Sequence, residues 1–380
     1  MANSREVVLK LVRIAMGWEN DFSFPEDINW KEVLNIASEQ GVEAIVIDGY
    51  EILKKKNPQI KLSLDSSENK SLLLEAIGRL KLIEYGNLQQ LEALTELSKI
   101  FHEKQIPFLL MKGFACGRYY PNPLHRPCGD IDIYPGDRFT ESNETLKAAG
   151  IDVDPYYYRH TASMIKGVMI ENHRVLGDLR GPHRQTRDFE AQLESEAKNS
   201  IKEGKDVIVG GREFPGAKYP TANFNALFLP WHVSAHFAFE RVTLRHLLDW
   251  ALFLINEGKD IEVGWFRESK TNYTYGYSKF VDILTNLSVR YLKIPVDSIP
   301  TEIVNDALGF NTSLADKVFD YMFVGQLREQ DDNVWKFRMN NVKRVWKERW
   351  KYKELYNMTT LGFLSKKVVS VVCRVGEHEE

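Results

Sequence analysis

Residues 107–134 read PFLLMKGFACGRYYPNPLHRPCGDIDIY and combine a predicted buried strand with a second, alternating one. The apolar run 108–111 has the length of a buried strand. A predicted helix and a proline-containing loop follow it. In residues 129–134 polar and apolar side chains then alternate, which predicts a strand with one buried and one solvated face.

Asp130 and Asp132 would occupy the solvated face of the second strand. Alternate residues of a strand lie about 6.5 Å apart along it. Two carboxylates this close repel each other unless a cation lies between them or one is protonated. A divalent metal is the simplest solution, because Mg²⁺ favours one or two carboxylates together with substrate phosphates.

The order of strand, Lys112-Gly113, helix, Arg126 and Gly129-Asp130-x-Asp132 resembles the core of the nucleotidyltransferase superfamily that includes polymerase beta. It is more closely similar to a bacterial branch of uncharacterised nucleotidyltransferase-like proteins, in which Lys-Gly replaces the Gly-Ser of other relatives. The resemblance implies an α+β fold with a polymerase-beta-type core, which is a small mixed sheet with helices. An N-terminal helical cap and a C-terminal helical domain would flank this core.

The resemblance also implies a third carboxylate on a neighbouring strand, which bridges a metal or takes the proton of the acceptor. Glu171 is the candidate, because relatives tend to carry an acid-x-His pair here and His173 follows at that spacing. Asp152 and Asp154 are the alternatives. The expected cofactor is Mg²⁺, with two ions bound by Asp130, Asp132 and Glu171, and Mn²⁺ could replace it.

Four residues are expected to bind the nucleotide of an NTP such as ATP: Lys112, Gly113, Arg126 and Gly129. A turn from strand to helix favours an anion, and glycine lets a phosphate approach closely. Lys112 and Arg126 would supply positive charge, and Arg can hold two phosphate oxygens at once. Arg118, inside the following helix, is expected to be a surface cation.

His232 and His236 lie four residues apart on a predicted helix, a spacing that could hold zinc. Packing is the alternative, because no Glu or Cys stands at an evident third ligand position. The resemblance places this helix near the nucleotide, so His236, Arg245 and Asp249 are expected to line the nucleotide cleft. His173, on the same strand face as Glu171, is expected beside the metal ligands. Asp249 lies among apolar residues and should have a partner such as Arg245.

The chain has 380 residues, 43% of them hydrophobic, and a net charge of −3. This length predicts two or three domains, and this charge gives no overall attraction to nucleic acid or anionic membranes. The scattered Cys116, Cys128 and Cys373, with no signal peptide or transmembrane run, predict a cytoplasmic protein. The first two cysteines are expected to be small apolar core residues.

The predicted domains are an N-terminal cap at 1–68, a core at 69–220, a helical domain at 221–330 and a basic tail at 331–380. Apolar periodicity predicts helices at 5–17, 30–40, 42–53, 69–105, 140–149, 227–236, 244–255, 277–291 and 313–327. The core should also contain a hairpin of strands 156–165 and 168–175, an exposed loop and helix in 178–205, and a short strand at 207–209.

Residues 334–353 form a basic segment with one apolar stripe, which consists of Trp335, Met339, Val342, Trp346 and Trp350. We expect a helix that docks on the body through these side chains and leaves its cations outside. A membrane-surface helix or a nucleic-acid patch is the alternative.

The predicted reaction is Mg²⁺-dependent transfer of a nucleoside monophosphate from an NTP to an acceptor hydroxyl. The acceptor could be a sugar, an antibiotic, a protein side chain or an RNA end. One alternative is a metal-dependent glycosyltransferase that uses Asp-x-Asp, although such enzymes place a larger nucleotide-binding region before this motif. The other alternative is a catalytically degenerate nucleotide-binding or scaffold protein, because the Gly-Ser pair is missing.

Overall fold

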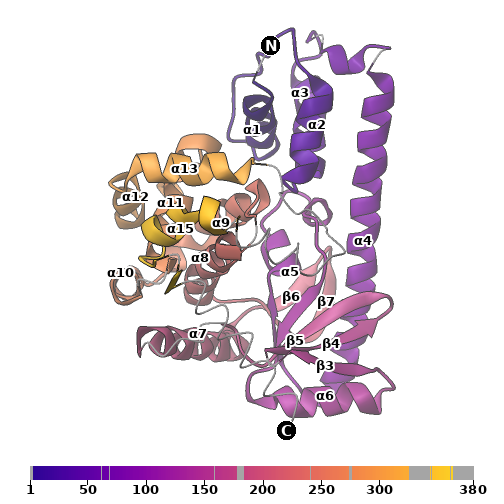
Figure 1. Cartoon of the computed structure of the whole chain (residues 1–380). Helices are drawn as coiled ribbons and strands as arrows, with labels where there is room; N and C mark the ends of the chain where they lie inside the picture. The colour runs from indigo at the N-terminus through magenta and orange to yellow at the C-terminus, as the bar shows by residue number, and fades with distance from the viewer. Residues whose placement is uncertain are drawn as a thin grey trace.

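The computed structural model describes residues 3–60, 62–67, 69–157, 159–177, 184–239, 241–273, 276–324, 343, 345–359 and 361–362. One mixed sheet and two groups of helices form the molecule, and the long helix α4 runs from the N-terminal helices down to the sheet (Figure 1). The strands are β1 (Phe108–Met111), β2 (Ile131–Tyr134), β3 (Val153–Tyr157), β4 (His160–Ile165), β5 (Val168–His173), β6 (Asp206–Val209) and β7 (Arg212–Lys218).

The helices of the first half are α1 (Ser4–Ala15), α2 (Trp30–Glu39), α3 (Glu43–Lys56), α4 (Lys70–Glu103), α5 (Gly113–Gly117), α6 (Phe139–Ala148) and α7 (Arg184–Glu203). The later helices are α8 (Ala222–Phe239), α9 (Leu244–Glu257), α10 (Val263–Asn272), α11 (Tyr277–Leu287), α12 (Thr301–Leu308), α13 (Thr312–Met322) and α15 (Arg349–Glu354). The predicted α+β class, a mixed sheet with helices at both ends of the chain, is confirmed.

The seven strands follow the order β3-β4-β5-β2-β1-β7-β6. At the centre, β1 pairs antiparallel with β2, and β2 pairs parallel with β5. Hairpins β4–β5 and β6–β7 complete the two sides. The two strands that carry the predicted acids are therefore direct neighbours in the middle of the sheet.

The hairpin predicted at Lys166-Gly167 is confirmed. Both turn residues have positive φ angles, 50° and 78°, as a two-residue hairpin turn requires. Strand β3 is separate from β4, whereas the sequence predicted one strand over 156–165. Strand β7 was missed, because Pro215 and Gly216 interrupt the alternation by which strands are recognised.

Helix α4 confirms the predicted long helix and contacts two different hydrophobic clusters. Its first part packs Ala76 and Leu80 against the N-terminal helices, and its last part packs Leu94, Leu97 and Phe101 against the sheet. These apolar residues recur at helical spacing and no proline interrupts them over 34 residues. The helix thus fixes the distance between the N-terminal helices and the sheet.

The N-terminal and C-terminal helices share one hydrophobic cluster. Residues of α1–α3, α8, α9, α11–α13 and α15 belong to it, together with the sheet residues Leu109, Met111 and Tyr134. A second cluster fills the opposite face of the sheet, under α4. The acids of β2 share the strand face of Tyr134, so they point toward the helical half. The domain boundaries at 68, 220 and 330 stay predictions.

The C-terminal tail differs from its predicted arrangement. Trp350 packs near Phe237 and Tyr321, but Trp346 is 56% exposed, because a turn at Glu348 separates the two tryptophans. Lys351 is buried instead of facing solvent, and its ammonium lies 3.7 Å from the Tyr321 ring centre. Trp335, Met339 and Val342 lie outside the described residues.

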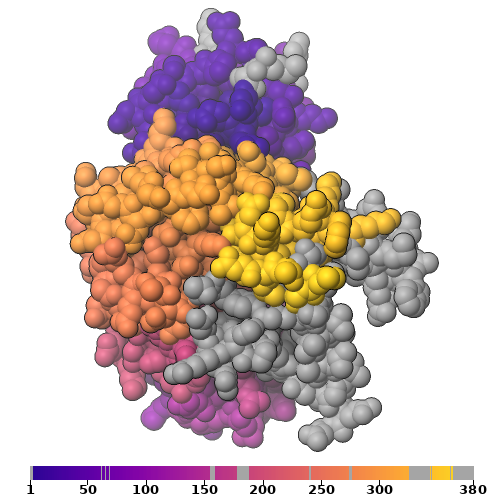
Figure 2. All heavy atoms as spheres, turned by 60° about the vertical axis from the view of Figure 1, so that its left-hand side comes forward, coloured from indigo at the N-terminus to yellow at the C-terminus, as the bar shows by residue number. Residues whose placement is uncertain are grey.

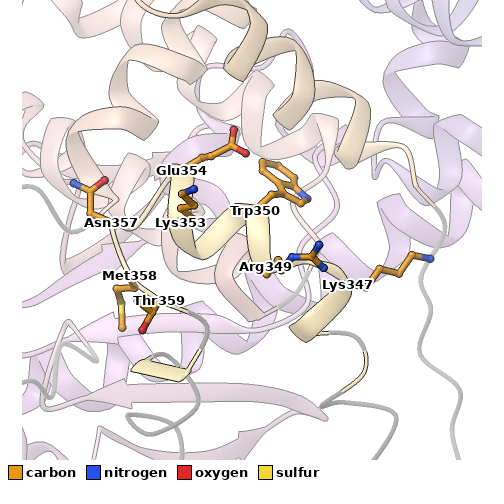
Figure 3. Close-up of a pocket in the computed structure, with 8 residues that line it drawn as sticks. All are labelled: Lys347, Arg349, Trp350, Lys353, Glu354, Asn357, Met358 and Thr359. Atoms are coloured by element: carbon orange, nitrogen blue, oxygen red, sulfur yellow. The ribbon is translucent and has the colours of Figure 1, made fainter.

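The described tail residues lie on the surface beside the later helices, in yellow next to orange (Figure 2), and they line a pocket. This pocket has a volume of about 840 Å³ and is lined by Lys347, Arg349, Trp350, Lys353, Glu354, Asn357, Met358 and Thr359 (Figure 3). None of these residues is a predicted site residue. Among the described residues, no helix is both long and apolar enough to cross a bilayer.

An ionic cluster joins the N-terminal helices to the core. His125 lies in the short 3₁₀ helix η2 (Pro123–His125), with its Nδ1 at 2.7 Å from Asp48 and its Nε2 at 3.0 Å from Glu84. Burial lowers the pKa of His125, but the two carboxylates outweigh it and raise this pKa above its ordinary value. The imidazolium therefore connects α3, α4 and η2.

We expect this cluster to make stability depend on pH. A group whose pKa is raised in the folded state stabilises the fold fully at pH values below its unfolded pKa, which is about 6.5 for His. This stabilisation disappears as the pH rises through the pKa of the folded state. His125→Gln should therefore lower the melting temperature more at pH 5.5 than at pH 9. Thermal unfolding of both proteins at both pH values measures this, and equal differences would contradict it.

Candidate functional site

Three carboxylates converge at the centre of the sheet. Asp132 of β2 pairs in register with Glu171 of the parallel strand β5, so their side chains leave the same face. Asp130 precedes β2 by one residue and shares that face with Asp132. Each of the three acids has a carboxylate oxygen within 4.8 Å of the others. The structure therefore brings together the three predicted metal ligands.

Lys112 completes one side of this carboxylate cluster. Its Nζ lies 2.8 Å from Asp132 Oδ2, and Asp132 is only 2% exposed. Lys112 has φ 48° and ψ −144°, a rare combination for a residue with a side chain. Such strain concentrates at functional sites. Helix α5 begins at Gly113 as predicted but has only five residues, so attraction of an anion here depends on the Lys112 charge more than on a helix dipole.

Two histidines complete the other side of the carboxylate cluster. His173 Nε2 lies 2.9 Å from Asp132 Oδ1 and 3.4 Å from Glu171 Oε2. His160 Nε2 lies 3.7 Å from Glu171 Oε1. The sequence predicted His173 but missed His160. The signal was available, because the two histidines are equally far from the hairpin turn and therefore pair across β4 and β5.

The electrostatics of the cluster show which charges balance. Burial alone would raise the pKa of Asp132, but Lys112 and His173 hold it below its ordinary range. A hydrogen bond from His173 lowers the pKa of Glu171. Burial and the Asp132 charge raise the pKa of Asp130 by more than the Lys112 charge lowers it. Three acids thus share the Lys112 ammonium and the Nε2 of His173, and the remaining negative charge favours a further cation.

The carboxylate cluster fits a magnesium ion by its donor chemistry. Its oxygens come from side chains on two adjacent strands, and they lie close enough to share an ion. Mg²⁺ prefers oxygen ligands and usually keeps only one or two protein carboxylates per ion. Asp130, Asp132 and Glu171 would therefore leave room for the phosphates of a substrate.

Arg126 occupies a different position from the one expected. It is 5% exposed, and its Nε and Nη2 donate to the two oxygens of Asp249 at 2.8 and 2.7 Å. Tyr120 donates a further bond to Asp249 at 2.7 Å. The expected partner Arg245 instead donates to the carbonyl of Pro127, while the fork of Arg126 pairs with both oxygens of Asp249. Binding of triphosphate by Arg126 stays a prediction.

His232 and His236 belong to a layer of three imidazoles with His246, which the sequence analysis missed. The ring centres of His232 and His236 are 4.3 Å apart, and His246 lies 5.9 Å from His236. Burial and the nearby Lys112 charge lower the pKa of His232. Among the described residues, the donor groups close enough for a metal do not include this layer. The structure therefore supports the alternative, in which His232 and His236 are packing residues near Lys112.

The two alternative acids, Asp152 and Asp154, do not belong to the carboxylate cluster. Asp154 lies on β3 at the edge of the sheet, away from the carboxylate cluster, and Asp152 precedes that strand. Cys116 is buried, which raises the pKa of its thiol to about 12, so it is a core residue as expected. Arg118 is not a surface cation. It pairs with Glu257 at 2.8 Å and lies over the Tyr219 ring.

The two glycines of the predicted nucleotide site differ in what they require. Gly113 has φ 42°, so a side chain there would be strained. Gly129 has no atom within 4 Å of the position that a Cβ would take. A methyl group at Gly129 therefore meets no protein atom and probes only what binds next to it.

Gly129→Ala should leave the melting temperature unchanged and raise the KM for NTP by about tenfold, because the methyl would separate backbone and phosphate. Gly264→Ala is the control, since that glycine is equally open but lies on α10. Steady-state kinetics with variable NTP measures the effect. An unchanged KM in Gly129→Ala would remove this residue from the nucleotide site.

No curated protein and no solved structure matches the chain. A family model described as an uncharacterised nucleotidyltransferase matches residues 26–292, more than half of the chain. The matched residues include the seven strands of the described chain, the carboxylate cluster and helices α2–α11. The chain therefore belongs to this family of nucleotidyltransferases.

Proposed function

We propose that this chain transfers a nucleoside monophosphate from an NTP to an acceptor hydroxyl with the help of Mg²⁺. The convergence of Asp130, Asp132 and Glu171 next to Lys112 is the observation that carries the proposal. Membership of the family supports nucleotidyl transfer as the reaction and an NTP as the substrate. Among the described residues that precede β2, β1 is the only strand. This disfavours a glycosyltransferase, which would place a larger nucleotide-binding region before Asp-x-Asp.

The reaction replaces one bond to phosphorus by another. The acceptor oxygen forms a bond to the α-phosphorus, and the bond between that phosphorus and the pyrophosphate oxygen breaks. Pyrophosphate leaves with its electron pair, and the acceptor proton passes to a carboxylate of the cluster. Two Mg²⁺ ions held by Asp130, Asp132 and Glu171 would neutralise the phosphates and align the acceptor oxygen, and Mn²⁺ could replace them.

The residues of the chain have separate tasks in this proposal. Lys112 pairs with Asp132 in the free protein, and exchanges this carboxylate for a phosphate oxygen when the substrate binds. In the chain without a metal ion on His173, the Nε2 of this residue holds Asp132 and Glu171 in place. The ion pair between Arg126 and Asp249 connects the loop between α5 and β2 to α9. His236 on α8 and Arg245 on α9 would lie on the helical side of the bound nucleotide.

The proposal is tested by nucleotide binding and turnover. Calorimetry with ATP, GTP, CTP and UTP should detect binding that requires Mg²⁺ and disappears with EDTA. α-³²P-labelled NTP should transfer label to the acceptor fraction of a cell extract, with one pyrophosphate released per label. Sugar transfer from a nucleotide-sugar would favour the glycosyltransferase instead. Absence of any nucleotide binding would favour a scaffold protein.

A further inference from the structure

A second group of donor atoms lies beside the carboxylate cluster and includes nitrogen. It consists of His160 on β4 and Glu171 and His173 on β5, and each residue has a ligand atom within 4.8 Å of the others. The register pairs His160 with His173 across the hairpin, and their ring centres are 5.1 Å apart. Glu171 lies two residues before His173 on the same strand face.

The chemistry of this histidine group differs from that of the carboxylate cluster. Mg²⁺ prefers oxygen, whereas two imidazoles and one carboxylate suit Zn²⁺, Mn²⁺ or Co²⁺. Two His and one Glu form a ligand set of catalytic zinc sites, in which the fourth position stays open for water or substrate. The side chains of His160 and Glu171 are 15% and 22% exposed, so an ion can reach them from solvent.

Glu171 belongs to both groups. Its Oε1 is the oxygen nearer to His160, at 3.7 Å, and its Oε2 is the oxygen nearer to His173, at 3.4 Å. Asp132 Oδ1 also lies 2.9 Å from His173 Nε2, so the two groups are in direct contact, and an ion bound through this nitrogen would replace that hydrogen bond. A carboxylate with two oxygens can bridge two ions, which in two-metal sites are about 3.5–4 Å apart.

We propose that His160, Glu171 and His173 bind a transition-metal ion of the Zn²⁺, Mn²⁺ or Co²⁺ class, with Glu171 as the ligand shared with the magnesium site. The neighbouring Mg²⁺ rests on the proposed function, but the histidine site does not need a nucleotide. The three ligands are held by two paired strands and a two-residue turn, which is a rigid support for a site.

Cobalt provides a readout that is independent of activity. The full chain is dialysed against Co²⁺ with excess Mg²⁺, and bound cobalt is counted by mass spectrometry and by its visible absorption. We expect one cobalt per chain, and displacement of it by Zn²⁺. His160→Gln should weaken binding by more than about 100-fold, because even outer partners of metal ligands change affinity 10–100-fold. His102→Gln, on the exposed end of α4, should bind like the unmodified chain.

The outcomes separate this inference from the proposed function. Equal cobalt binding by His160→Gln and the unmodified chain would overturn the site, and so would a near-ultraviolet band of a cobalt–thiolate bond, which would place the ion on a cysteine. Mg²⁺-dependent nucleotide binding without retained cobalt would overturn the site alone. If only His160→Gln loses cobalt and the unmodified chain binds no nucleotide, the result would support the histidine site and contradict the proposed transferase. Thermal unfolding of His160→Gln confirms that the variant is folded.

Discussion

Asp132→Asn should lower the rate of nucleotidyl transfer by about 10³-fold or more. The substitution keeps the shape of the side chain but removes the negative charge from the centre of the carboxylate cluster. Metal ions at such sites contribute several kcal/mol of charge stabilisation in the transition state, and each 1.36 kcal/mol corresponds to about tenfold in rate. The effect should appear in kcat, measured as pyrophosphate release at saturating NTP.

Asp154→Asn is the matched control for this prediction. Asp154 is also an aspartate on a strand of the same sheet, but it lies on the edge strand β3 and is exposed. Its substitution should leave kcat unchanged. Asp130→Asn should lower kcat like Asp132→Asn, and it is half-buried, so it provides a second variant. Full activity in either Asp130→Asn or Asp132→Asn would contradict the assignment.

Arg126→Ala should destabilise the protein by about 3–5 kcal/mol, because it leaves Asp249 as an uncompensated buried charge. Asp249 is 6% exposed, and both of its oxygens accept from Arg126. Tyr120 would remain as a neutral donor, which cannot replace a guanidinium. The free energy of unfolding in urea measures this loss.

Two further variants serve as comparisons for the stability of Arg126→Ala. Arg267→Ala removes a similar forked pair with Asp306, but the Arg267 side chain is 52% exposed, so the change should stay within about 1 kcal/mol. The double variant Arg126→Met with Asp249→Leu should recover most of the stability. A well-packed apolar pair can replace a buried ion pair with little loss in the free energy of unfolding. A small effect of Arg126→Ala would contradict the structural role and favour a role in binding phosphate.

The sequence predicted the parts of the site that depend on local pattern. Alternation around Ile131 placed Asp130 and Asp132 on one face, and unbroken helical spacing predicted α4. Strand β7 has no such alternation, and the turn at Glu348 gave no signal that would have separated Trp346 from Trp350. Local patterns predict elements well only where neither proline, glycine nor an unexpected turn interrupts them.

Pairings between distant residues could be predicted only in part. The Lys166-Gly167 turn sets the register that brings His160 opposite His173, so this contact could have been inferred. The resemblance suggested Glu171, but its position opposite Asp132 depends on how β2 and β5 pair in parallel, which no turn determines. Arg126 and Asp249 are 123 residues apart, and the choice between Arg126 and Arg245 as partner depends on how α9 packs. Tertiary packing decides such choices.

The central claim is that a metal ion and a triphosphate meet at the carboxylate cluster. A crystal structure of the chain with Mg²⁺ and an NTP whose α–β bridge cannot be cleaved tests it directly. We predict an ion bound by Asp130 and Asp132, with the triphosphate on that ion and Lys112 turned from Asp132 to a phosphate oxygen. A nucleotide bound elsewhere, with Lys112 still paired to Asp132 and no ion between the acids, would contradict the account.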